Sequence, residues 1–156
     1  ESGNMSFHCE DCSAHHFAET VYQTHQVIIL PPVEFIKEFP DEDVTIHIDR
    51  MRLTQVITNF LGNAKKFTSQ GHIKLGYFCD KEKKEIHIFV EDTGAGIPKE
   101  ELQMIFERFY KRNEFVQGVG LGLAISKVIV EKMNGHIDVQ SEVNKGSRFT
   151  AVLPYL

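Results

Sequence analysis

One segment of the chain, residues 50–67, constrains the fold more than any other because its apolar residues recur at helical spacing. It reads RMRLTQVITNFLGNAKKF, and its apolar positions are separated by three or four residues. A helix with such a stripe must bury it against another layer of secondary structure. The stripe consists of Leu53, Val56, Ile57, Phe60, Leu61, Ala64 and Phe67.

The layer that this helix covers is predicted by segments in which apolar and polar residues alternate, as they do in half-buried strands. The predicted strands are 31–40, 43–49, 72–80, 85–92, 136–142 and 147–154, with turns at Pro40–Asp43, KEKK and VNKG. The other predicted helices are 14–26, 99–104 and 121–133, the last ended by Asn134-Gly135. Because strands alternate with helices but also come in pairs, we predict an α/β fold with a mixed sheet and helices on one face.

Composition excludes several classes of protein. The 156 residues, 42% apolar and 25% charged, are typical of one soluble globular domain. The net charge of −5 excludes a broad surface for nucleic acid or for an anionic membrane. The longest apolar run, VIILPPV, is too short to span a bilayer. The odd number of cysteines, three, indicates a reducing compartment.

Polar residues at the rim of the 50–67 helix point to cation and phosphate chemistry. Asn59, Asn63 and Lys66 lie at positions i, i+4 and i+7 and therefore share one face beside the apolar stripe. Two amide oxygens can ligate Mg²⁺, and a lysine one turn further can contact phosphate oxygens. The alternative is a solvated helix face that happens to contain two asparagines.

The segment VEDTGAGIP places an acidic residue at the end of a predicted strand. Asp92 is followed by Gly94 and Gly96. A carboxylate held there could accept a hydrogen bond from an exocyclic amine such as that of adenine, and glycines allow a flat base to approach the backbone. The alternative is an ordinary turn after a strand, which Asp-Thr-Gly would also suit.

The stretch QGVGLGLAISK, residues 117–127, has three glycines directly before a helical run. Backbone N–H groups at a helix start attract phosphate, but several unrelated folds use this device. No strand precedes these glycines, so the dinucleotide-binding motif does not apply. No Gly-Lys-Ser/Thr follows them, so the stretch is not a P-loop.

These motifs stand in a definite order, with FERFY between the second and third and Lys145-Gly146-Ser147-x-Phe149 at the end. The order resembles the N, G1, F, G2 and G3 boxes of the catalytic ATP-binding domain of bacterial sensor histidine kinases. Five ordered boxes are far more specific than any one of them. The resemblance covers about residues 49–154 and implies the GHKL, or Bergerat, two-layer α/β sandwich.

The resemblance also implies a role for each matching residue. Asn63 would be the principal Mg²⁺ ligand, Asn59 would assist it, and Lys66 would contact the phosphates of ATP. Asp92 would bind the adenine amine. The other implied nucleotide contacts are Gly94, Gly96 and Ile97 around the base, Tyr110 and Lys111 after the F box, Arg108 toward the γ-phosphate, Gly118 and Gly120 as a lid hinge, Leu121, Gly122 and Leu123 at the helix start, and Ser147 by the adenine.

Position 59 separates two branches of this fold. DNA gyrase, mismatch-repair ATPases and a class of heat-shock chaperones usually have a glutamate there, which activates water. Asn59 cannot act as a general base, so the resemblance favours a kinase that passes the γ-phosphoryl group of ATP to a histidine. The alternatives are a GHKL-type ATPase, which steady ATP turnover would favour, and a nucleotide-binding pseudokinase module.

The acceptor histidine is expected on another domain. None of the eight histidines is followed by the acidic residue, basic residue and proline that mark it in the family. We therefore predict that residues 1–15 are the end of an acceptor-domain helix and a linker, and that 16–156 are the catalytic domain.

The resemblance implies four binding partners, namely ATP, Mg²⁺, a dimerisation and histidine-acceptor domain, and a response regulator receiver domain downstream. We expect a cytoplasmic location without nucleic-acid binding or direct membrane contact. A parent protein anchored in the bacterial inner membrane is compatible with this expectation.

In the segment HCEDCSAHH, a C-x-x-C and the paired histidines after it are four potential zinc ligands, but there is a single C-x-x-C and the four are crowded into nine residues. A short strand near Phe7 and Cys9 and a following helix are therefore the favoured interpretation. Two other histidines, His47 and His87, alternate with apolar neighbours and are predicted to face solvent from strands. The four potential ligands are Cys9, Cys12, His15 and His16.

The predicted lid, RNEFVQ, is short and carries Phe115 and Val116. A short lid loses little conformational entropy when it becomes ordered. Its two apolar residues are interpreted either as packing within the lid or as a contact with the acceptor domain.

Overall fold

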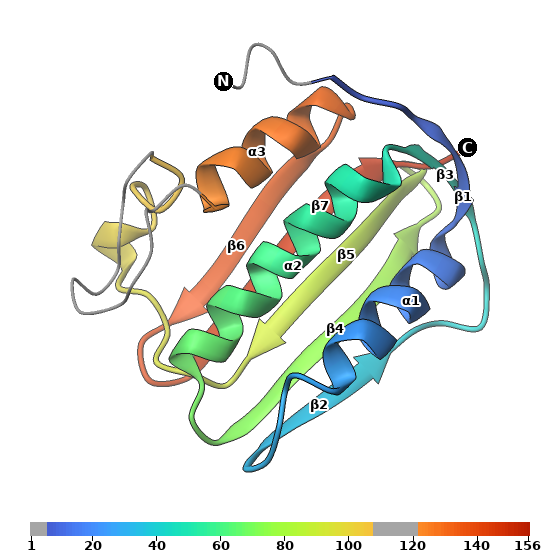
Figure 1. Cartoon of the computed structure of the whole chain (residues 1–156). Helices are drawn as coiled ribbons and strands as arrows, with labels where there is room; N and C mark the ends of the chain where they lie inside the picture. Colours follow the sequence, from blue (N-terminus) through green and yellow to red (C-terminus); the bar gives the residue numbers. More distant parts are fainter. Residues whose placement is uncertain (1–5, 108–121) are drawn as a thin grey trace.

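A five-stranded sheet forms one layer of the structure, and the helices lie together on one of its faces (Figure 1). The computed structural model describes residues 6–107 and 122–156. Its strands are β1 (Glu10–Ser13), β2 (Val33–Glu38), β3 (Thr45–Ile48), β4 (Gly71–Asp80), β5 (Glu85–Asp92), β6 (His136–Glu142) and β7 (Gly146–Pro154). Its helices are α1 (Ala14–Gln26), α2 (Arg50–Phe67) and α3 (Gly122–Lys132), with a 3₁₀ turn η2 (Lys99–Glu101).

The large sheet is mixed, as the sequence predicts. Its strand order is β2-β4-β5-β7-β6, with β2 parallel to β4 and the other neighbours antiparallel. Helices α1, α2 and α3 cover the same face (Figure 1). The predicted two-layer α/β sandwich is therefore confirmed.

Helix α2 has the predicted bounds, and its stripe is the centre of the core. All of the stripe except the terminal Phe67 is buried to 3% exposure or less. Opposite it, alternate residues of β4 and β5 turn toward the helices, among them Ile73 and Ile88. The centroids of the Phe60 and Phe149 rings lie 5.4 Å apart, so α2 packs directly on β7.

Within the described residues, no helix is both long and apolar enough to cross a membrane.

The pairing expected for the two strands around Pro40–Asp43 is wrong. Both strands exist, but β2 pairs with β4 in the large sheet, whereas β3 pairs with β1 in a separate two-stranded sheet. Alternation of residues predicts which side of a strand is buried, but it does not specify the neighbouring strand.

Two shorter predictions also need correction. The strand expected near Phe7 lies at Glu10–Ser13, where it pairs with β3. The helix expected over residues 99–104 is reduced to the 3₁₀ turn η2, which starts directly after Pro98. A single turn leaves most of its backbone groups without helical hydrogen bonds, so a short polar segment does not extend it.

Asp49 caps the N-terminus of α2. Its carboxylate accepts hydrogen bonds from the backbone N–H of His8 (2.8 Å) and of Arg52 (3.1 Å). Burial alone would raise the pKa of Asp49, but these hydrogen bonds outweigh burial and hold the pKa below its usual value. Since the folded pKa is lowered, this stabilisation is present near neutral pH and is lost as the pH falls through the folded pKa.

We predict that Asp49→Ala lowers the free energy of unfolding by about 1–2 kcal/mol at neutral pH, because α2 loses its cap. The difference from wild type should shrink as the pH falls below about 4, where aspartate protonates. Urea unfolding at several pH values measures both effects. The control is Asp41→Ala in the exposed turn. An Asp49→Ala protein as stable as this control would contradict the capping role.

Candidate functional site

Three chain segments distant in sequence meet at the C-terminal end of β5, beside the end of α2 (Figure 1). The backbone N–H of Ala95 donates to the carbonyl of Phe67, the last residue of α2, at 3.2 Å. On its other side, the carbonyl of Ala95 accepts from the N–H of Asn144 in the β6–β7 turn at 2.7 Å. The loop after β5 is therefore clamped between α2 and that turn.

Asp92 ends β5 as a buried carboxylate at this junction, with 7% exposure. Its Oδ1 accepts from the N–H of Gly94 at 2.8 Å, so the loop begins with a turn that the side chain itself stabilises. The preceding acid, Glu91, lies on the opposite face of the strand and pairs with Arg148 at 2.9 Å. Asp92 is thus the acid that β5 directs toward the helices.

Ser147 is paired with Asp92 across β5 and β7, and it is equally buried. Its hydroxyl shares a hydrogen bond of 2.8 Å with the hydroxyl of Ser141 on β6. Ser141 in turn accepts from the N–H of Ile97 at 2.7 Å. The structure therefore brings Asp92, Ile97 and Ser147 to one place, as the sequence predicts, through a serine that sequence reasoning missed.

The glycines of this loop are required by backbone packing. A Cβ on Gly94 would lie 2.2 Å from the carbonyl oxygen of Phe67. Gly96 has a φ of +76°, and its Cβ would lie 2.1 Å from the carbonyl oxygen of Glu142. Both approaches are shorter than any side chain permits, so this loop can press against α2 and β6 only with glycine at these positions.

Asn59 joins α2 to the start of α3. Its Nδ2 donates to the carbonyl of Gly122 and to the hydroxyl of Ser126, both at 3.1 Å. Ser126 is fully buried within α3, and it is a functional candidate that sequence reasoning missed. With both amide hydrogens directed to α3, the Oδ1 of Asn59 remains as an acceptor.

Asn63 follows one turn later, partly exposed, and Lys66 lies exposed near the end of α2. Asn59, Asn63 and Lys66 all lie within α2, as their spacing predicts, and Asn59 contacts α3. Leu123 is partly buried against the core. The remaining predicted contacts lie outside the described residues, namely Arg108, Tyr110, Lys111, Gly118, Gly120 and Leu121, together with the lid residues Phe115 and Val116.

Thr68 is a second residue that sequence reasoning missed. Its hydroxyl is buried and makes no hydrogen bond to any residue that the structure describes. It lies beside Gly94, whose Cβ would come within 2.8 Å of it. A buried polar atom without a partner is uncommon in folded proteins and often marks a place for water or a ligand.

The cysteine and histidine segment near the N-terminus makes ordinary structural contacts. Cys12 is buried under Arg50, whose guanidinium lies 3.5 Å from its sulfur, whereas Cys9 is exposed. The ring of His15 shares a hydrogen bond with the hydroxyl of Tyr77. Among residues 6–107 and 122–156, the one group of three potential metal ligands lies elsewhere, at the β4–β5 turn.

Together, these groups could hold a ligand with an amine at one end and a cation at the other. A buried carboxylate, a free hydroxyl and a tightly packed glycine loop suit a flat base that donates hydrogen bonds. Two amide groups and a lysine on α2 suit a hydrated cation that bridges to anionic oxygens. These two chemistries are the ones that the sequence predicts for the two ends of the site.

Comparison with known proteins agrees with this geometry. Residues 48–156 match the family described as "Histidine kinase-, DNA gyrase B-, and HSP90-like ATPase". The sensor histidine kinase WalK of Bacillus subtilis is 39% identical over 128 residues, which cover 79% of this chain and 21% of WalK. The sensor protein SrrB of Staphylococcus aureus is 44% identical over 110 residues, which cover 68% of this chain and 19% of SrrB. The chain therefore spans about a fifth of the length of these relatives.

Solved structures show the same fold. Full-length ShkA in complex with AMPPNP superposes with a TM-score of 0.87 and 27% identity, over 97% of this chain and 32% of ShkA. The nucleotide-free catalytic domain of the histidine kinase ThkA superposes with a TM-score of 0.82 and 28% identity, over 95% of this chain and 96% of that domain. The similarity thus extends over nearly the whole of the ThkA domain.

Proposed function

The chain belongs to the histidine kinase-, DNA gyrase B- and HSP90-like ATPase family, and we propose that it is the Mg-ATP-binding catalytic domain of a two-component sensor histidine kinase. In this proposal, it donates the γ-phosphoryl group of ATP to a histidine on a separate dimerisation and acceptor domain. The observation that carries the proposal is that position 59 holds an asparagine. Its side-chain N–H groups donate to Gly122 and Ser126 of α3, which orients the amide.

The residues of the site fit Mg-ATP in their chemistry. Asn63 and the Oδ1 of Asn59 would ligate Mg²⁺, and Lys66 would contact the phosphates. The carboxylate of Asp92 would accept from the adenine amine, next to the buried hydroxyl of Thr68. Backbone N–H groups of Gly120, Leu121, Gly122 and Leu123 would face the phosphates, and Gly118 and Gly120 would form the hinge of the lid.

The chemistry that bound Mg-ATP would supply is a transferable γ-phosphoryl group with its charge neutralised by the cation. The protein would contribute mainly orientation and the exclusion of competing water. An amide cannot take a proton from water, so Asn59 offers no general base for hydrolysis. This supports transfer to another nucleophile over steady ATP turnover, which is the activity expected of the ATPase alternative.

The finer parts of the proposal concern the whole protein. We propose that its partners are the histidine-acceptor domain of the same protein and a response regulator receiver domain downstream. Residues 1–15 would link the acceptor domain to the catalytic domain, and Arg108, Tyr110 and Lys111 would complete the phosphate contacts. We also propose a cytoplasmic location for this segment without direct membrane contact.

We predict that Asp92→Asn and Asn63→Ala each weaken the binding of Mg-ATP by about tenfold or more, because each removes a contact to a charged or ionic group. Asn at position 92 can still accept from the N–H of Gly94, so the loop should keep its turn. Isothermal titration calorimetry with a non-hydrolysable ATP analogue and Mg²⁺ measures the affinity, and circular dichroism checks the fold.

Two matched variants serve as controls for this experiment. Asp138→Asn changes an exposed acid on β6, and Gln55→Ala removes an amide from α2 two turns before Asn63. Both should bind nucleotide as wild type does. Wild-type affinity in Asp92→Asn and Asn63→Ala would contradict the assignment of these residues to the site.

We further predict that Ser126→Ala acts on Mg-ATP binding through Asn59. Loss of one of the two acceptors for Nδ2 loosens the amide, and the dissociation constant for Mg-ATP should rise about three- to tenfold. Binding measured in EDTA should change less, because the effect passes through the cation ligand. Ser126→Thr keeps the hydroxyl and should restore affinity. An equal loss with and without Mg²⁺ would indicate a packing defect and contradict the positioning role.

A further inference from the structure

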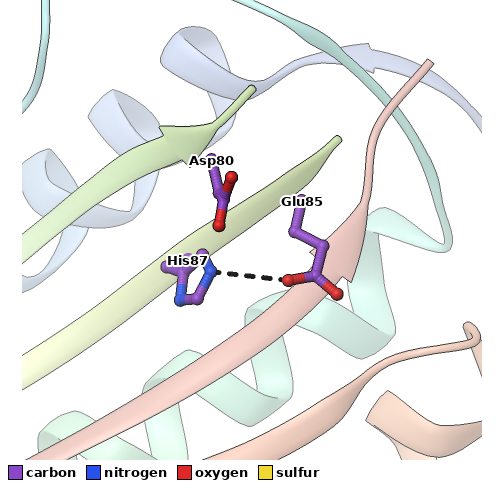
Figure 2. A group of neighbouring side chains, drawn as sticks. All are labelled: Asp80, Glu85 and His87. Atoms are coloured by element: carbon purple, nitrogen blue, oxygen red, sulfur yellow. Dashed lines mark ion pairs between the residues drawn. The ribbon is translucent and has the colours of Figure 1, made fainter. Parts of the chain in front are cut away.

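A second group of potential ligands lies at the opposite end of β5 from Asp92. Asp80 ends β4, Glu85 begins β5 directly opposite it, and His87 follows two residues later. Figure 2 shows the three side chains gathered at the end of the β4–β5 hairpin. One ligand atom from each lies within 4.8 Å of the other two.

His87 is held in place but lacks a hydrogen-bond partner. Its ring stacks on Phe78 with centroids 4.6 Å apart and an angle of 15° between the planes. The Nε2 atom is buried and makes no hydrogen bond to any described residue. Its nearest carboxylate oxygen, Glu85 Oε1, lies at 3.7 Å, beyond hydrogen-bond reach (Figure 2). The sequence predicts that this histidine faces solvent from its strand. In the structure, only 20% of its side chain is exposed.

The carboxylate of Asp80 is oriented by the turn. Its Oδ1 accepts from the backbone N–H of Glu82 (3.1 Å) and of Lys83 (3.2 Å). These bonds hold the side chain at the hairpin end next to Glu85. The cluster therefore combines a carboxylate that the turn orients, a second carboxylate and a buried imidazole nitrogen.

We propose that Asp80, Glu85 and His87 bind a Zn²⁺ ion. Imidazole with carboxylates is a ligand set that suits zinc, whereas Mg²⁺ prefers oxygen alone. Ligand atoms about 2.0–2.2 Å from a tetrahedral zinc ion lie about 3.3–3.6 Å apart, so the 3.7 Å between His87 Nε2 and Glu85 Oε1 needs only a small adjustment. Side-chain rotation of the partly exposed Asp80 closes the remainder, and water completes the coordination.

The charges around the cluster are mixed. The two carboxylates balance the charge of the ion, while Lys81, Lys83 and Lys84 of the turn oppose it. Lys81 is paired with Glu42 at 3.2 Å, so a carboxylate outside the cluster offsets that charge. These lysines lower the affinity without blocking the site, since all three are exposed.

The zinc site is separate from the proposed nucleotide site. Glu85 and Asp92 are the two ends of β5, about 23 Å apart for a strand that rises about 3.3 Å per residue. Zinc bound at the hairpin end would pin β4 to β5 without touching the ATP contacts. The proposal therefore stands or falls independently of the kinase function.

The test is a calorimetric titration of Zn²⁺ into the untagged, nucleotide-free chain. A Cys9→Ser background removes the exposed thiol, which could compete for the ion. We expect one equivalent to bind, and His87→Ala to weaken binding about tenfold or more. His136→Ala is the matched control, because His136 forms a similar pair with Asp138 at 3.6 Å and belongs to no three-ligand group among the described residues.

Two further measurements keep the result decisive. The ¹⁵N chemical shifts of the His87 ring should change on addition of Zn²⁺, while those of His136 should not. If His87→Ala fails to fold, Asp80→Asn replaces it, since asparagine keeps an acceptor for the turn but loses the charge. Absence of zinc binding, or equal zinc affinity in wild type, Asp80→Asn and His87→Ala, would overturn the proposal.

Discussion

The burial of one face of α2 against the sheet is the interaction on which the rest of the structure depends. Six stripe residues, from Leu53 to Ala64, are removed from water, and each of the five larger side chains typically contributes about 1.5–3 kcal/mol of transfer free energy. Once that face is fixed, the rotation of the helix is fixed as well. The amides of Asn59 and Asn63 must then lie at its rim, where α3 begins and the loop after β5 returns.

That loop is held by backbone contacts more than by side chains. Its glycines permit it to lie against the carbonyls that end α2 and β6, and Asp92 sets its first turn. The carboxylate thereby becomes a buried, oriented acceptor. The other end of β5 carries Glu85 and His87 of the proposed zinc site. The two proposed sites therefore lie at opposite ends of this strand.

Much of this arrangement could be predicted from the sequence, because its signals are local. The bounds of α1, α2, β5 and β6 follow from periodicity and end signals, and the structure confirms them. The pairing of β2 and β3 could not be predicted, since alternation carries no information about neighbours. Ser126 and Thr68 were missed because the role of a lone hydroxyl depends on the residues that pack beside it, which the sequence does not show. The covered state of His87 depends likewise on Phe78 of the adjacent strand.

The central proposal is that Asn59 suits this site to transfer phosphate to a histidine and not to water. The direct measurement mixes this chain with ATP, Mg²⁺ and a separately purified acceptor domain of the same protein, and follows acid-labile phosphate on the acceptor histidine together with free phosphate. We expect phosphohistidine on the acceptor domain, and little free phosphate from the catalytic chain alone. Steady release of phosphate by the chain alone, without a phosphorylated acceptor, would contradict it.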